Sequence, residues 1–84
     1  MNQNKPPFSA TSQSGIIYKT LKKRIGKWVS MVDLGNKAGC WAVHSRIADI
    51  RKYVKPSGLE VLNEVRVSDD GKSHSFYMLK GVEL

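Results

Sequence analysis

Apolar residues recur along this chain with two different spacings, and the change between them predicts two kinds of element. From Ile17 to Val54 the apolar side chains return every three or four positions, as they do on the buried face of a helix. After Leu59 they return at every second position, as in a strand with one buried face. Helices are therefore expected first, and strands after them.

The first predicted helix begins near Ser14, whose hydroxyl can accept a hydrogen bond from an amide of the opening turn. Its inner stripe consists of Ile17, Leu21 and Ile25. Gly26 follows directly and can adopt the left-handed conformation that ends a helix. The helix is expected to reach this glycine.

A shorter second helix is predicted after a brief extended segment at residues 27–30. Ser30 and Asp33 have the spacing of a capping box, in which each polar group satisfies an amide at the start of a helix. Gly39 is placed to end this helix, and a third helix is expected over about residues 41–53.

The third predicted helix has one apolar face and one polar, partly basic face. The apolar face consists of Val43, Ile47, Ile50 and Val54. The far side carries Trp41, Ser45, Ala48 and Lys52, with His44, Arg46, Asp49 and Arg51 on the flanks. Small residues in the middle of the far side would let this helix approach a partner closely.

Two strands are predicted after the break at residues 56–58. The first has apolar residues at odd positions from Leu59 to Val67, interrupted by Asn63, and the second covers residues 75–79. The polar residues 68–71 between them form a strong turn signal. The chain is therefore expected to be an α+β domain, a three-helix bundle with a C-terminal β-hairpin in the order α-β-α-α-β-β.

The domain limits follow from the same pattern. Residues 1–13 are polar and contain prolines, which predicts a flexible N-terminal arm. The folded domain is expected over residues 14–80, followed by a short tail at residues 81–84.

Two consecutive helices joined by a glycine turn are typical of the helix-turn-helix, whose second helix enters the DNA major groove. Ser45-Arg46-Ile47-Ala48-Asp49-Ile50-Arg51, followed by Gly58-Leu59 and then by His74 to Leu79, resembles the small winged helix-turn-helix domains of bacteriophages and prophages. The resemblance covers about residues 14–80. It implies that the hairpin is a wing beside a DNA-reading helix. The segment from Tyr53 to Ser57 is longer than the basic link usual in such domains.

Charge is consistent with an acidic partner. The 84 residues carry a formal net charge of +7 and a pI of about 9.8, which attracts DNA, RNA or an anionic membrane surface. No apolar run reaches the roughly 18 residues of a membrane-spanning helix, and the N-terminus lacks the apolar core of a signal peptide. A cytoplasmic location is expected, in the nucleoid of a bacterium or in the host cytoplasm for a phage protein.

Arginine can bond two acceptors of guanine or clamp a phosphate, whereas lysine serves phosphates better than bases. The residues predicted to contact DNA are Trp41, His44, Ser45, Arg46, Arg51, Lys52, Lys55, Lys72 and His74. Weaker phosphate contacts are expected from Lys19, Lys22, Lys23 and Lys27.

Each of these candidates also has a purely structural interpretation. Arg46 can pair with Asp49 or Asp33, and Trp41 can pack under the turn, which is the placement we expect for it. The lysines at the end of the first helix can simply stabilise the helix dipole. The tip of the hairpin can be a solvated turn that contacts nothing.

An enzyme is not expected, because no nucleophile–base pair, paired carboxylates or metal-ligand spacing is visible. Neither a cofactor nor a metal site is predicted, and Cys40 is interpreted as an ordinary small residue. The leading hypothesis is double-stranded DNA binding in the regulation of transcription or replication. The alternative is a protein-interaction module, with a possible homodimer, and RNA binding ranks last because interleaved aromatic residues are lacking.

Overall fold

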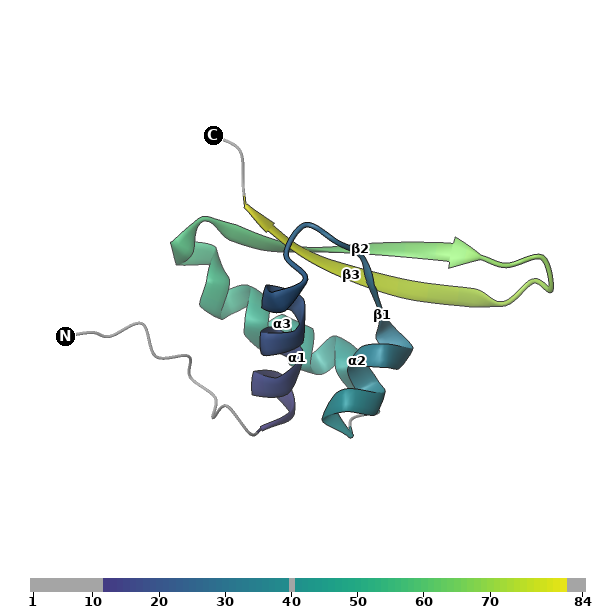
Figure 1. Ribbon diagram of the computed structural model, residues 1–84, viewed down its shortest axis with the longest axis horizontal. Helices are drawn as coiled ribbons and strands as arrows, with labels where there is room; N and C mark the ends of the chain where they lie inside the picture. The colour runs from purple at the N-terminus through teal and green to yellow at the C-terminus, as the bar shows by residue number, and fades with distance from the viewer. Residues whose placement is uncertain (1–11, 40, 82–84) are drawn as a thin grey trace.

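The computed structural model describes residues 12–39 and 41–81 as three helices against a three-stranded antiparallel sheet (Figure 1). The α+β class and the expected order of elements are confirmed, and the arrangement is compatible with a winged-helix-like domain. Most of the predicted arm, Cys40 and residues 82–84 lie outside the described residues. The elements are α1 (Gln13–Lys23), β1 (Val29–Ser30), α2 (Met31–Ala38), α3 (Val43–Val54), the 3₁₀ turn η1 (Lys55–Ser57), β2 (Leu59–Val67) and β3 (Ser73–Gly81).

α1 begins and ends earlier than the sequence pattern predicts. Ser12, not Ser14, is the N-cap, and its Oγ accepts a hydrogen bond from the amide of Gly15 at 3.1 Å. Ser14 is buried against the core instead. At the other end, the chain leaves the helix after Lys23, so Ile25 lies beyond it and is half exposed.

The early end of α1 has a tertiary cause. Gly26 adopts a left-handed conformation with φ of 82°. Its amide donates to the carbonyl of Leu79 on β3 at 2.8 Å. The contact with the sheet therefore turns the chain toward β1 before another helical turn can form.

α2 is confirmed at both ends, whereas the start of α3 differs from the prediction. The hydroxyl of Ser30 accepts a hydrogen bond from the amide of Asp33 at 3.1 Å, and Gly39 ends α2 with φ of 62°. α3 begins at Val43, two residues later than expected, and no side chain caps it at Ala42. Trp41 therefore precedes the helix.

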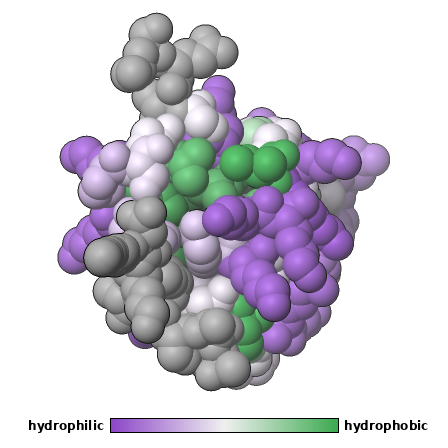
Figure 2. All heavy atoms as spheres, turned by 60° about the vertical axis from the view of Figure 1, so that its left-hand side comes forward, coloured by the Kyte–Doolittle hydropathy of each residue, from purple (hydrophilic) through white to green (hydrophobic). Residues whose placement is uncertain are grey.

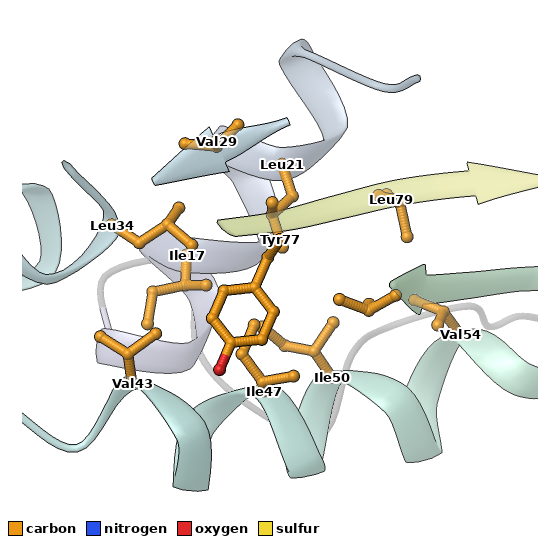
Figure 3. Packing of buried hydrophobic residues seen from close by; sticks show 11 residues of the cluster. Ile17, Leu21, Val29, Leu34, Val43, Ile47, Ile50, Val54, Tyr77 and Leu79 are labelled. Atoms are coloured by element: carbon orange, nitrogen blue, oxygen red, sulfur yellow. The ribbon is translucent and has the colours of Figure 1, made fainter. Parts of the chain in front are cut away.

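The core lies between the three helices and one face of the sheet (Figure 3). The Tyr77 ring reaches down from β3 among the aliphatic side chains, with its hydroxyl toward α3. This packing confirms the predicted apolar face of α3, all four members of which are buried. The buried cluster consists of Ile17, Leu21, Val29, Leu34, Val43, Ile47, Ile50, Val54, Val61, Tyr77 and Leu79.

The hairpin of β2 and β3 is longer than the core that it covers. β3 is the central strand, with β1 on one side and β2 on the other. Val61 pairs with Leu79 over the helices and is buried. Val65 and Val67 lie on the same face of β2 but are mainly exposed, because the hairpin projects beyond the helices there (Figure 1).

Candidate nucleic-acid interface

The side of α3 opposite the core is open to solvent. Ser45, Ala48, Asp49 and Lys52 are all exposed, while the residues on the other side pack against α1 and the sheet. The outward face that the sequence predicted for this helix is therefore present. The side chains in the middle of this face, Ser45 and Ala48, are small, and Asp49 and Lys52 lie beside them.

Arg46 takes the structural partner that the sequence offered. Its Nη1 lies 3.8 Å from Oδ2 of Asp49, one helical turn away, and about 39% of its side chain is exposed. Its Nε is buried and has no hydrogen-bond partner among the described residues. An exposed pair of this kind contributes at most about 1 kcal/mol to stability, so it can be exchanged for another anion at little cost.

Arg51 is directed to the sheet. Its Nε and Nη2 both donate to the carbonyl of Val61, at 3.3 and 3.1 Å. The bond ties the second half of α3 to β2. A DNA contact by Arg51 would compete with this bond or use the remaining N–H groups of the guanidinium.

His44 also has a partner in the sheet. The Tyr77 hydroxyl is hydrogen-bonded to Nδ1 of His44, and the two rings meet edge to face with centroids 5.7 Å apart. Burial raises the pKa of the Tyr77 phenol above its usual value, so it keeps its proton. Nδ1 is therefore engaged by the sheet, and Nε2 is the ring nitrogen of His44 left for a contact outside the domain.

Trp41 does not pack under the turn, and this expectation is wrong. Its side chain is fully exposed, because α3 begins only at Val43 and Trp41 stays outside the bundle. It borders an apolar pocket of about 350 Å³ along α2. The pocket is lined by Met31, Val32, Gly35, Asn36, Gly39, Trp41 and Val43.

The turn of the hairpin is held by its own polar groups. Oδ1 of Asp70 accepts hydrogen bonds from the hydroxyl of Ser68 and, at 3.1 Å, from the amide of Lys72. These bonds hold the pKa of the Asp70 carboxyl below its usual value. The side chains of Lys72 and His74 are exposed beside the turn.

Arg66 was not among the predicted site residues, and the structure shows what it does. Its guanidinium lies 4.3 Å from the centroid of the Phe76 ring and 5.9 Å from that of Trp28, and it pairs with Glu64. It therefore stacks on the face of the sheet that is turned away from the helices.

The basic residues of α1 separate into two groups. Lys22 lies over the ring of Tyr18, 5.7 Å from its centroid. Lys19 and Lys23 instead border a basic hollow of about 400 Å³ between α1 and α2, which is lined by Ile16, Lys19, Thr20, Lys23, Arg24 and Lys37.

Lys37 in this hollow was missed, because only the packing of α2 against α1 brings it there. Of the other predicted cations, Lys27, Lys52 and Lys55 are exposed.

Seen from the end of the domain on the left of Figure 1, hydrophilic side chains cover broad areas, with a band of hydrophobic residues between them (Figure 2).

No family model, curated protein or solved structure matches the chain. Within residues 12–39 and 41–81, no group of three or more His, Cys, Asp or Glu side chains is placed to hold a metal ion. None of the helices in that part of the chain is long and apolar enough to cross a membrane.

Proposed function

We propose that the chain binds double-stranded DNA as a winged helix-turn-helix domain. α3 would lie in the major groove, and the hairpin of β2 and β3 would contact the backbone beside it. The observation that carries the proposal is the outward face of α3, which the rest of the described chain leaves uncovered while a long hairpin projects beside the bundle.

The chemistry of this face suits a groove. Ser45 and Ala48 are small enough to let the helix backbone come close to base edges, and Ser45 offers a hydroxyl. His44 adds its Nε2 as a polar group at the start of the helix, because its other ring nitrogen is hydrogen-bonded to Tyr77. Lys52 and Lys55 continue along the same side as phosphate contacts.

Asp49 fits this proposal through Arg46. A free carboxylate would repel phosphates, but Asp49 already neutralises the guanidinium one turn before it. When DNA supplies a phosphate or a guanine to Arg46, the weak pair with Asp49 gives way. Arg46 is therefore the arginine that we assign to sequence reading, and Arg51 the one that holds α3 against β2.

A role in transcription or replication of a phage, prophage or mobile element is supported by the sequence resemblance alone. The net charge of +7 supports the class of partner and not the biological role.

Fluorescence anisotropy with labelled duplexes at several salt concentrations tests the proposal. The wild-type chain should bind, and its affinity should fall steeply with salt because phosphate contacts release counterions. Ser45→Glu places a charge in the middle of the α3 face and should lower the affinity by about tenfold or more. Lys52→Ala should make the dependence of log affinity on log salt concentration shallower, by an amount equal to roughly one phosphate contact.

Lys80→Ala is the matched control for Lys52→Ala. It also removes one lysine, but Lys80 lies on the face of β3 turned away from the helices, opposite Glu60. Its affinity should stay within about twofold of the wild type. Absence of binding to any duplex at low salt, or equal losses in all three variants, would refute the proposal.

A protein-interaction module is the second candidate, and Trp41 favours it. A fully exposed tryptophan stands beside an apolar pocket that the same chain forms, next to the mainly exposed Val32. A chain that carries both a projecting group and a pocket can pair with a second copy around a two-fold axis, with each Trp41 on the pocket of the other. Sedimentation velocity over a range of concentrations tests this, since Trp41→Ala should abolish any dimer.

A further inference from the structure

The basic hollow between α1 and α2 is a second concentration of positive charge, apart from α3. Lys19, Lys23 and Arg24 come from α1 and the residue that caps it, and Lys37 comes from the last turn of α2. No acidic side chain lines the hollow. The two ion pairs among residues 12–39 and 41–81 are those of Arg46 and Arg66, so neither neutralises this cluster.

The donors that face the hollow are cationic. The hydroxyl of Thr20 donates to the carbonyl of Ile16 at 2.8 Å, so its proton is already used within α1. Ile16 contributes only apolar surface from its side chain. A ligand of the hollow must therefore offer acceptors and negative charge, and lysines recognise phosphate as point charges without demanding one orientation.

The hollow lies on the other side of α1 from α3. Tyr18 on one flank of α1 packs edge to face against Tyr53 of α3, with ring centroids 5.4 Å apart. Lys19 and Lys23 lie around the helix toward the opposite flank, where Lys37 of α2 faces them. A duplex bound along α3 would therefore leave the hollow open to another ligand.

The size and spread of the charges favour a backbone over a single small anion. Four cations from two helices surround a space of about 400 Å³. One phosphate group would compensate only part of this charge, whereas each strand of a duplex carries a charge about every 3.4 Å. Successive phosphates match a row of lysines better.

We propose that the basic hollow binds the sugar–phosphate backbone of a second nucleic-acid segment, so that one chain bridges two duplexes. The bridging rests on the proposed function of α3, which holds the first duplex. The hollow contributes no base reading, since its lysines act on phosphates as point charges without a planar fork. Bridging is therefore independent of the sequence of the second segment.

A bead assay tests bridging directly with the full chain. A biotinylated duplex on beads is loaded with protein, and capture of a second, fluorescent duplex is measured. The double variant Lys23→Glu with Lys37→Glu should still bind the immobilised duplex within a few-fold, but capture of the second duplex should fall by about tenfold. The single variant Lys37→Glu should already lower capture, and its matched control Lys80→Glu, which makes the same charge change on the face of β3 turned away from the helices, should keep capture within about twofold.

Equal capture by Lys37→Glu and Lys80→Glu overturns the proposal. A titration of the amide NMR spectrum with pyrophosphate separates its failure from that of the function proposed for α3. If no duplex binds, the function of α3 is refuted, and only amide shifts at residues 19–24 and Lys37 with pyrophosphate preserve an anion site there. Such shifts without any capture of a second duplex overturn the assignment to nucleic acid and identify free phosphate as the ligand.

Discussion

The charged residues of α3 and those of the basic hollow differ in the number of hydrogen bonds and ion pairs that they form within the domain. On α3, Arg46 forms an ion pair with Asp49. Arg51 donates hydrogen bonds to the carbonyl of Val61, and His44 is hydrogen-bonded to Tyr77. In the hollow, four cations share a space that no carboxylate lines. The charged side chains of α3 are therefore held in a defined geometry. The cations of the hollow have no carboxylate among the residues that line it.

The side chains with a defined orientation and the cations without a carboxylate partner therefore lie in separate parts of the domain. A helix that reads bases must be held in place, since base contacts require defined directions. Side chains that bind phosphates need only proximity. This contrast between α3 and the basic hollow is consistent with the two proposals.

The largest effect is expected from the core beneath α3. Ile50 is fully buried, so Ile50→Ala should lower the free energy of unfolding by about 2–5 kcal/mol. Urea denaturation followed by circular dichroism measures this loss. Val67→Ala is the control, because Val67 is 69% exposed and its loss should cost no more than about 0.5 kcal/mol. Similar losses in both variants would show that α3 is not held by the core.

The bond between His44 and Tyr77 should come next. Tyr77→Phe keeps the buried ring but removes the hydroxyl that bonds to His44, and should cost about 1 kcal/mol of unfolding free energy at neutral pH. The phenol also has a pH signature. Because its folded pKa is raised above the unfolded value of 10.0, its stabilisation is present below pH 10 and is lost as the pH rises through the folded pKa.

Denaturation curves of both proteins from pH 7 to 11 measure this signature. The difference in stability between wild type and Tyr77→Phe should shrink in the alkaline range. A difference that stays constant or grows there would contradict the raised pKa of the buried phenol.

The two arginines of α3 should separate in a direct comparison. Arg51→Met keeps an aliphatic stem but loses the bonds to Val61, and should cost about 1 kcal/mol of unfolding free energy. Arg46→Met breaks only a partly exposed ion pair and should stay within about 0.5 kcal/mol. In DNA binding the order should reverse, with Arg46→Met relaxing sequence preference more. A larger stability loss for Arg46→Met would invert our assignment of roles.

The smallest effect is expected at the tip of the hairpin. The hydrogen bonds from Ser68 and Lys72 lower the folded pKa of Asp70 below the ordinary value of 3.8 for an aspartate. Its contribution to stability is therefore present above that value and is lost as the pH falls through the folded pKa. An NMR titration of the Asp70 carboxyl measures the pKa, and Ser68→Ala should move it upward. An unchanged pKa in that variant would show that the Ser68 bond does not lower it.

Local signals in the sequence predicted the elements well. The stripe from Val43 to Val54, the cap at Ser30 and the glycine after α2 depend on residues close in the chain, and the structure confirms them. The ends of α1 and the start of α3 could not be predicted in this way. The contact of Gly26 with Leu79 ends α1 early, and it joins residues that are far apart in the sequence.

The candidate site was predictable only as far as helix periodicity reaches. Periodicity placed Ser45, Ala48 and Lys52 outward, but it could not show that Arg51 turns to a carbonyl on β2. Helix periodicity could not predict the basic hollow either, because only the packing of α2 against α1 brings Lys37 close to Lys19 and Lys23.

Arg66 lies over the rings of Phe76 and Trp28, which links the projecting hairpin to the segment before β1. An isolated two-stranded ribbon is only marginally stable, but here a side chain from its outer half contacts the residue just before β1. β1 leads directly into the cap of α2. The projecting hairpin and the first turn of α2 are therefore connected through Arg66, Trp28 and β1.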